Sequence, residues 1–183
     1  MEFYKVNLNG KEYGLPIVEI KPGLSIAVLD MLSSRALSHD ASYAVIEKIK
    51  ESGIDTSKID TVISAETKGI TLAYQVAEYL GCEMVILRKE QKIYYKDVTK
   101  ALVDTYTTKG SHYLYLENGQ IPKIKDKNVL IVDDVVSTGS SLSAIEAIVN
   151  EIGGNICGKA FVFAEGEAAE RDDVIFVDSL PLL

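Results

Sequence analysis

The chain of 183 residues is long enough for one domain with a substantial core and short for two. Its hydrophobic share of 47% and charged share of 25% are ordinary for a globular protein, so neither disorder nor a fibrous protein is indicated. The net charge of -8 argues against nucleic acid as a partner, because such binding depends on neutralising phosphates. It does not exclude a small anionic ligand in a locally basic pocket.

The N-terminal residues and the two cysteines bear on the cellular compartment. The start, MEFYKVNLNG, has no basic segment followed by an apolar one, and no run of about 18 apolar residues occurs. Cys82 and Cys157 lie in apolar surroundings without metal-ligand spacing, so we expect reduced, buried thiols. These features predict a cytoplasmic protein with no membrane partner.

The first predicted elements are a hairpin and two helical segments. Asn9-Gly10 separates the strand-like runs FYKVNL and EYGLPIVEI, a pattern typical of a two-residue hairpin turn. Residues 25–33 are apolar at helical spacing, and residues 38–51 predict an amphipathic helix that Gly53 ends.

Strands and helices alternate from residue 60 onward. Apolar runs predict strands over 60–65, 84–88, 128–132, 155–164 and 174–177, and helices are predicted over 69–80 and 140–152. Continuously apolar strands in this order indicate a parallel sheet covered on both faces. We therefore expect an α/β fold, a doubly wound and mainly parallel sheet, in a single domain spanning 1–183.

The alternation stops between residues 89 and 127. Two strand-like pieces, ALVDTYT and SHYLYLE, are joined there by Lys109-Gly110, which predicts a hairpin or mobile flap inserted in the core. Residues 88–109 contain six basic and three acidic residues, so this flap is locally positive in an acidic chain. Such a segment suits closure over an anionic substrate.

The stretch NVLIVDDVVSTGSSL, residues 128–142, combines two kinds of binding group. Asp133 and Asp134 come at the carboxyl end of a strand, where ligands of open α/β sheets bind. The following residues open a helix, and the amide groups and positive dipole of a helix start suit a phosphate. The acids suit hydroxyls, a divalent cation or developing positive charge. A ribose with a 5′-phosphate and a magnesium-bound pyrophosphate carries all these groups.

This stretch resembles the phosphoribosyl pyrophosphate (PRPP) motif of the type I phosphoribosyltransferases. The resemblance implies that Asp133 and Asp134 contact the ribose hydroxyls as catalytic residues. It also implies that the 5′-phosphate is held by Ser137, Thr138, Gly139, Ser140 and Ser141. A plain strand end followed by a helix cap explains any two of these residues but not the whole run.

The likeness extends to two upstream segments. AETKGI is similar to the adenine-type pyrophosphate loop, and ILRKEQKIY is similar to the strand that leads into the catalytic flap. The pyrophosphate ligands implied are Glu66, Thr67, Lys68, Gly69, Arg88, Lys89 and Lys92, with Arg88 also catalytic. A plain turn with a surface lysine, or a solvated charged loop, remains the alternative for each segment alone. The flap departs from the family pattern. Adenine-type enzymes have Ser-Tyr and a nearby Glu in the flap, whereas the closest stretch of this chain is DTYTT at 104–108.

The resemblance predicts transfer of phosphoribose from PRPP to a purine base, with Mg2+ carried by PRPP near the acid pair and no direct protein ligand. Hypoxanthine–guanine enzymes usually have an Asp where this chain has Ser137, so adenine- or xanthine-type enzymes are favoured, and the AETKG loop favours adenine. Xanthine, hypoxanthine–guanine and orotate are the alternatives. A non-catalytic PRPP-sensing regulator is the competing class.

The resemblance also implies roles for two further segments. Residues 1–37 are the expected hood over the base, and residues 164–173 are either a base-side wall or a solvated loop. A homodimer is implied as well.

Overall fold

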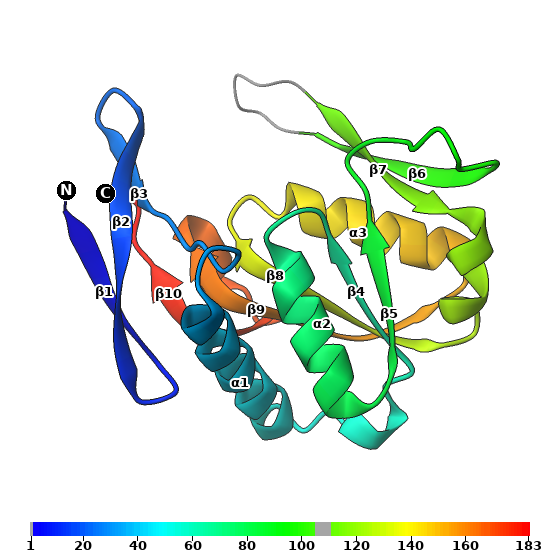
Figure 1. The fold of residues 1–183 in the computed structure, drawn as a ribbon, viewed down its shortest axis with the longest axis horizontal. Helices are drawn as coiled ribbons and strands as arrows, with labels where there is room; N and C mark the ends of the chain where they lie inside the picture. Colours follow the sequence, from blue (N-terminus) through cyan, green and yellow to red (C-terminus); the bar gives the residue numbers. More distant parts are fainter. Residues whose placement is uncertain (1, 105–110) are drawn as a thin grey trace.

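The computed structural model describes residues 2–104 and 111–183, and Figure 1 shows their arrangement. Its centre is a five-stranded sheet in the order β10-β9-β8-β4-β5, in which every neighbouring pair is parallel. The strands are β4 (Thr61–Ala65), β5 (Glu83–Leu87), β8 (Asn128–Val136), β9 (Asn155–Glu165) and β10 (Ile175–Leu180). The predicted α/β class with a parallel sheet is confirmed.

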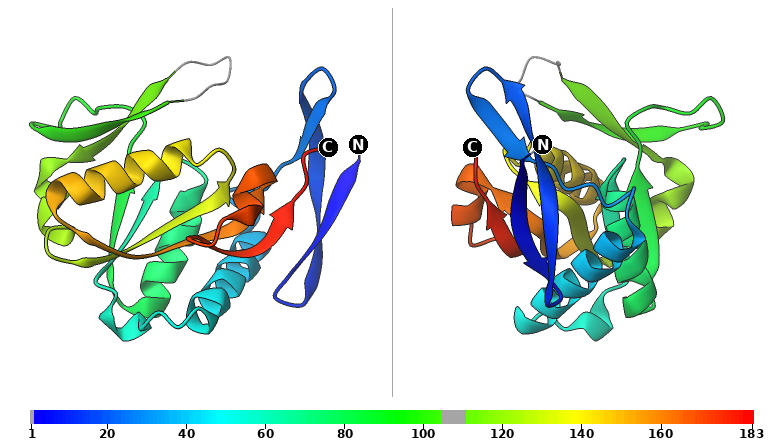
Figure 2. Two further views of the ribbon diagram at one scale, coloured as in Figure 1. Left: turned by 180° about the vertical axis from the view of Figure 1, so that it is seen from behind. Right: turned by 60° about the vertical axis from the view of Figure 1, so that its left-hand side comes forward.

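Helices cover both faces of this sheet. The helices α1 (Arg35–Glu51) and α2 (Gly69–Leu80) lie on one face, and α3 (Ser140–Ile152) lies on the other (Figures 1 and 2). Alternate residues of the strands accordingly enter different core clusters: Val62 packs with α1 and α2, whereas its neighbour Ile63 packs with α3. Burial on both faces is why these strands are continuously apolar. No described helix has the length and apolar character needed to cross a membrane.

A small antiparallel sheet, β1-β2-β3, forms the N-terminal part: β1 (Phe3–Leu8), β2 (Lys11–Lys21) and β3 (Leu24–Ala27). The predicted hairpin is present, and its turn residues Asn9 and Gly10 both have positive φ, 52° and 74°, as a type I′ turn requires.

The helix predicted over 25–33 is wrong. Ser25 instead exchanges backbone hydrogen bonds with Leu183 at the other end of the chain, of 2.6 and 2.9 Å. This pairing with the C-terminus outweighs the local helical periodicity, which a single sequence window cannot reveal.

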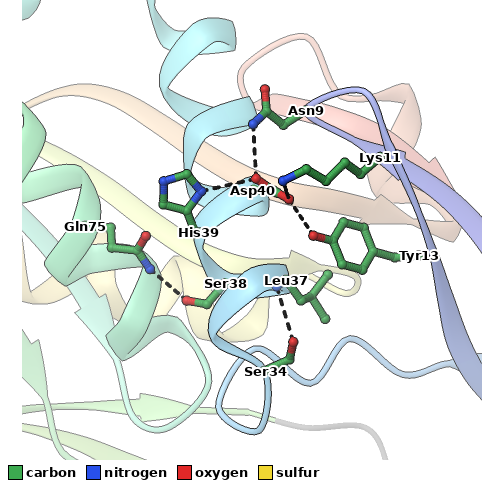
Figure 3. A network of polar contacts seen from close by, with 9 residues as sticks. All are labelled: Asn9, Lys11, Tyr13, Ser34, Leu37, Ser38, His39, Asp40 and Gln75. Carbon is green, nitrogen blue, oxygen red and sulfur yellow. Dashed lines mark hydrogen bonds and ion pairs between the residues drawn. The ribbon is translucent and has the colours of Figure 1, made fainter.

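Asp40 on α1 ties the small sheet to the core (Figure 3). Its carboxylate is 1% exposed and accepts hydrogen bonds from Asn9, Lys11 and Tyr13, all from β2 or the turn before it. Lys11 Nζ lies 2.8 Å from Asp40 Oδ2. The helix begins three residues before its predicted start because Ser34 Oγ caps it, accepting from Leu37 N at 3.3 Å.

The segment inserted between β5 and β8 contains a hairpin of β6 (Val98–Val103) and β7 (His112–Glu117), which packs over α3. Arg88 and Tyr115 exchange backbone hydrogen bonds of 2.9 and 2.8 Å and so attach the hairpin to the end of β5. The Lys109-Gly110 connection and most of the 104–108 stretch lie outside the described residues. The described residues also form three 3-10 helices: η1 (Thr56–Lys58), η2 (Asn118–Lys123) and η3 (Gly166–Glu170).

Candidate active site

Two loops meet at the carboxyl edge of the central sheet. One follows β4 and the other follows β8, and these strands are hydrogen-bonded neighbours, so their carboxyl ends open on the same side. A cavity of about 410 Å³ lies between them. It is lined by Ala65, Glu66, Thr67, Lys68, Lys89, His112, Leu114, Asp133, Asp134, Val135 and Ser141. The structure therefore brings the predicted pyrophosphate loop and the acid pair into one cavity.

A second, smaller hollow of about 130 Å³ adjoins the first. The predicted phosphate turn, residues 137–141, lines it. Asp133, Val135 and Ser141 line both hollows, whereas Asp134 lines the larger one only, so Asp133 stands where the two hollows meet. A sugar carrying phosphates at both ends has this order of groups.

The acid pair lies inside β8 rather than after it, because the strand runs four residues beyond its predicted end. Asp133 Oδ1 accepts a hydrogen bond from the amide of Asp134 at 2.9 Å. Burial, reinforced by the negative charge of Asp134, raises the pKa of Asp133 well above its usual range. Burial also raises the pKa of Asp134, against the opposing effect of Lys68, whose Nζ lies 3.9 Å from Asp134 Oδ2. Two desolvated acids of this kind favour a hydroxyl-bearing or positively charged ligand.

Gly69 is required by the packing around Asp133. A Cβ atom at this position would overlap both Ser64 Oγ and Asp133 Oδ1, at separations well under the 3.0 Å that real Cβ atoms keep. Any side chain would therefore displace the acid or the start of α2. Ser64 Oγ itself is buried and has no hydrogen-bond partner among the described residues.

The phosphate turn presents backbone amides at the start of α3. Gly139 has a φ of 78° and stands at the N-cap, where it supplies no side chain to the exposed amides. Thr138 Oγ1 and Ser140 Oγ lie 3.0 Å apart, and the Ser140 amide lies 3.4 Å from Thr138 Oγ1. The turn thus carries amide and hydroxyl groups of the kind that bind anions, and phosphate binding by residues 137–141 stays a prediction.

Glu66 connects the loop after β4 to the end of β5. Its Oε1 lies 3.1 Å from Arg88 Nη2, and its Oε2 accepts a hydrogen bond of 2.9 Å from the Lys89 amide. The peptide bond between Glu66 and Thr67 is cis. The Lys89 side chain lines the large cavity, but Arg88 and Lys92 do not, and Lys92 Nζ lies 3.6 Å from Glu90 Oε2. Pyrophosphate binding by these residues stays a prediction.

His112 is a cavity residue that the sequence did not identify. It begins β7 and lines the large cavity together with Leu114 from the same strand. Burial, and to a smaller extent the positive charge of Lys89, lowers the pKa of His112. In the sequence, His112 is recognisable only as the first residue of a predicted strand in the inserted segment, which does not indicate a cavity position.

The acidic side chains of the site suit a metal ion that enters already bound to a phosphate-containing ligand. Among residues 2–104 and 111–183, no group of three or more His, Cys, Asp or Glu side chains is placed to hold a metal ion. The half-buried, neighbouring carboxylates of Asp133 and Asp134 nevertheless fit a cation whose other ligands come from a phosphate group.

The family profile described as phosphoribosyl transferase domain matches residues 33–181, which include both loops and the acid pair. The chain belongs to the phosphoribosyltransferase family. It is 30% identical over 135 residues to the adenine phosphoribosyltransferase of Brachyspira hyodysenteriae, covering 74% of this chain and 76% of that one. Among solved structures, the APRTase from Giardia lamblia complexed with 9-deazaadenine aligns with a TM-score of 0.71 and 23% identity over 90% of this chain and 93% of that one. At this identity the structural likeness concerns the fold.

Another relative of this phosphoribosyltransferase is a regulator. The probable purine biosynthesis transcriptional regulator PurR of Streptococcus pneumoniae is 30% identical over 156 residues, which cover 84% of this chain and 53% of the regulator. The chain thus spans about half the length of that protein. The family includes enzymes and regulators at similar identity to this chain.

Proposed function

We propose that this phosphoribosyltransferase transfers 5-phosphoribose from PRPP to a purine base, most favourably adenine, and releases pyrophosphate. The observation that carries the proposal is the order of groups along the two adjoining hollows: phosphate turn, acid pair, pyrophosphate loop. No single loop accounts for that order, whereas PRPP uses all three. The relatives named as adenine phosphoribosyltransferases support adenine as the base.

In this arrangement each part of PRPP has a partner of suitable chemistry. The turn 137–141 holds the 5′-phosphate, and Asp133 and Asp134 hold the ribose hydroxyls and stabilise positive charge as the sugar becomes oxocarbenium-like. The loop 66–69, which contains Lys68, neutralises the leaving pyrophosphate together with Lys89 and with Arg88, the residue after β5. Mg2+ bound with PRPP supplies further neutralisation of that leaving group.

Several finer statements accompany the proposal. Position 137 is a serine in this chain, whereas hypoxanthine–guanine enzymes have an acidic residue there, beside the base. Residues 1–37 are the proposed hood over the base. Xanthine, hypoxanthine and guanine are the alternative bases. We also propose purine salvage in the cytoplasm as the setting and a homodimer as the working form.

A PRPP-binding regulator without catalysis is the second candidate. The match to the Streptococcus pneumoniae regulator over 84% of this chain favours it, as does the unusual flap sequence. Both candidates require PRPP binding, and they differ only in turnover.

One assay separates these candidates. The protein is incubated with Mg2+, PRPP and adenine, guanine, hypoxanthine, xanthine or orotate, and released pyrophosphate and new nucleotide are measured, while calorimetry records PRPP binding. The enzyme proposal predicts release with one purine, adenine first. Binding of PRPP without release for any base would replace the enzyme with the regulator, and absence of PRPP binding would refute both.

A further inference from the structure

The loop between β9 and β10 places Arg171 against the phosphate turn. Arg171 Nη1 lies 2.9 Å from the point that a Cβ atom on Gly139 would occupy. The guanidinium therefore fills the space that any other residue at position 139 would need. The glycine at the N-cap of α3 serves two purposes, a positive φ and the close approach of a cation.

Neighbouring charges hold the guanidinium in this direction. Asp173 accepts two hydrogen bonds of 2.8 Å, one from Arg171 Nε and one from Arg171 Nη2. Both bonds lie on one edge of the planar group, which leaves Nη1 as the terminal nitrogen turned toward Gly139. The Arg171 side chain is 33% exposed, so its charge is partly shielded from solvent.

A second ion pair fixes Asp173 in turn. Lys159 Nζ on β9 lies 2.7 Å from Asp173 Oδ2 and 2.6 Å from Glu146 Oε1 on α3. The Lys159 side chain is 19% exposed. This chain of contacts links α3, β9 and the loop, and so relates the position of Arg171 to the helix whose first turn forms the phosphate site.

The phosphate turn lacks a positive side chain of its own. Residues 135–145, VVSTGSSLSAI, contain no lysine or arginine. A phosphate monoester carries roughly 1.5 to 2 negative charges at neutral pH, whereas amides, hydroxyls and a helix dipole supply only partial positive charge. An arginine stays charged at any physiological pH and prefers phosphate oxygens.

We propose that Arg171 is a phosphate-stabilising residue, which supplies the positive charge for the 5′-phosphate held by the turn 137–141. Asp173 and Lys159 are positioning residues that direct it. This inference rests on the proposed function, since it assigns a role at the 5′-phosphate end of the same ligand. The loop 164–173 then belongs to the phosphate side of the site.

Separate probes for the two ends of PRPP test this role. Isothermal titration calorimetry measures ribose 5-phosphate, which reports the phosphate turn, and magnesium pyrophosphate, which reports the loop 66–69. The proteins compared are the wild type, Arg171→Gln and Arg171→Lys. Lys58→Gln is the control, because it also removes one positive charge. Lys58 is 75% exposed and lies in η1, before the amino end of β4.

We expect Arg171→Gln to weaken ribose 5-phosphate binding by about 10-fold or more, as for loss of a charge-assisted contact, and to leave pyrophosphate binding within about twofold. Arg171→Lys should recover part of the lost affinity, and Lys58→Gln should change neither probe. Raising the salt concentration should weaken ribose 5-phosphate binding less in Arg171→Gln than in the wild type.

Two results would overturn the assignment while leaving the proposed function intact. One is unchanged ribose 5-phosphate affinity in Arg171→Gln. The other is an equal loss for both probes in Arg171→Gln and in Arg171→Lys, since a general structural defect would affect both ends of the site. If the wild type bound neither ribose 5-phosphate nor PRPP, the proposed function and this inference would both be wrong.

Discussion

The carboxylate of Asp133 packs against the backbone of Gly69, so closely that a Cβ atom on this glycine would overlap Asp133 Oδ1. Gly69 is the first residue of α2, and Asp133 lies in β8, the strand next to β4. The pyrophosphate loop and the acid pair are therefore in direct contact, and a change in one should displace the other.

Replacing Gly69 with alanine should reduce turnover by a factor on the order of 10², because small displacements of catalytic groups have effects of this size. The added methyl also crowds Ser64 Oγ, so we expect the free energy of unfolding to fall by about 1 to 3 kcal/mol. Steady-state kinetics and urea unfolding measure the two effects. Gly14→Ala is the control for the unfolding measurement, because its Cβ would lie an ordinary 3.4 Å from Phe3. Full activity in Gly69→Ala would contradict the close contact.

The change Asp134→Asn should lower turnover by a factor on the order of 10² or more while the protein stays folded. The substitution preserves shape but removes the negative charge that would stabilise the oxocarbenium-like sugar. Pyrophosphate release under saturating PRPP and base measures the loss, and circular dichroism confirms the fold. Near-normal turnover would show that Asp134 does not act on the sugar.

The change Asp133→Asn should stabilise the protein at neutral pH although it lowers activity. Burial raises the pKa of Asp133 above its unfolded value near 3.8, so the folded state is penalised once the group must ionise. The free energy of unfolding of the wild type therefore decreases as the pH rises through the pKa that Asp133 has in the folded state. Thermal melting should give similar melting temperatures for both proteins at pH 4 and a higher melting temperature for the variant at pH 8.

Asp178→Asn, at an exposed position in β10, is the control for this comparison. A lower melting temperature for Asp133→Asn at pH 8 would contradict the argument.

His112 should make pyrophosphate binding depend on pH. Burial, followed by Lys89, lowers the pKa of His112 from 6.5, so the ring gains a positive charge only at acidic pH. That charge joins Lys68 and Lys89 around the cavity and offsets part of the charge of Glu66 and the acid pair. Calorimetry across a series of pH values below 6.5 should show pyrophosphate binding that tightens more steeply with falling pH in the wild type than in His112→Gln, with equal binding at pH 8. Parallel pH profiles for the two proteins would exclude this role.

The Asp40 contacts should matter for stability and not for turnover. Hydrogen bonds from Lys11, Tyr13 and Asn9 hold the pKa of Asp40 below its usual range, so the stability it contributes is present above the unfolded value near 3.8 and is lost at lower pH. Asp40→Asn should melt several degrees below the wild type at pH 7, with a smaller difference at pH 3. The control Glu12→Gln, which removes an exposed ion pair with Lys5, should melt close to the wild type. Equal melting temperatures for Asp40→Asn and the wild type at pH 7 would contradict this assignment.

Local signals predicted the helices that border the site. The bounds of α2 and α3 match the sequence prediction at both ends. Their C-terminal ends are fixed locally, because glycines with positive φ, Gly81 at 67° and Gly153 at 87°, end them through the backbone itself. The predicted helix over 25–33 failed. Its first residues lie in β3, which pairs with the nearby β2 across the turn at 22–23, a local hairpin that the helical periodicity obscured. Ser25 also pairs with Leu183, which no local window contains.

The residues of the candidate site also fall into two groups, those that the local sequence predicted and those that only the tertiary structure placed. The acid pair and the phosphate turn were read from the sequence because they are contiguous, so a strand, two acids and a helix start already fix their relative positions. The approach of the loop 66–69, the entry of His112 into the cavity and the direction of Arg171 depended on segments far apart in the chain. Only the pairing of strands and the packing of α3 decide such positions, because they arise from long-range hydrogen bonds and ion pairs rather than from backbone preferences.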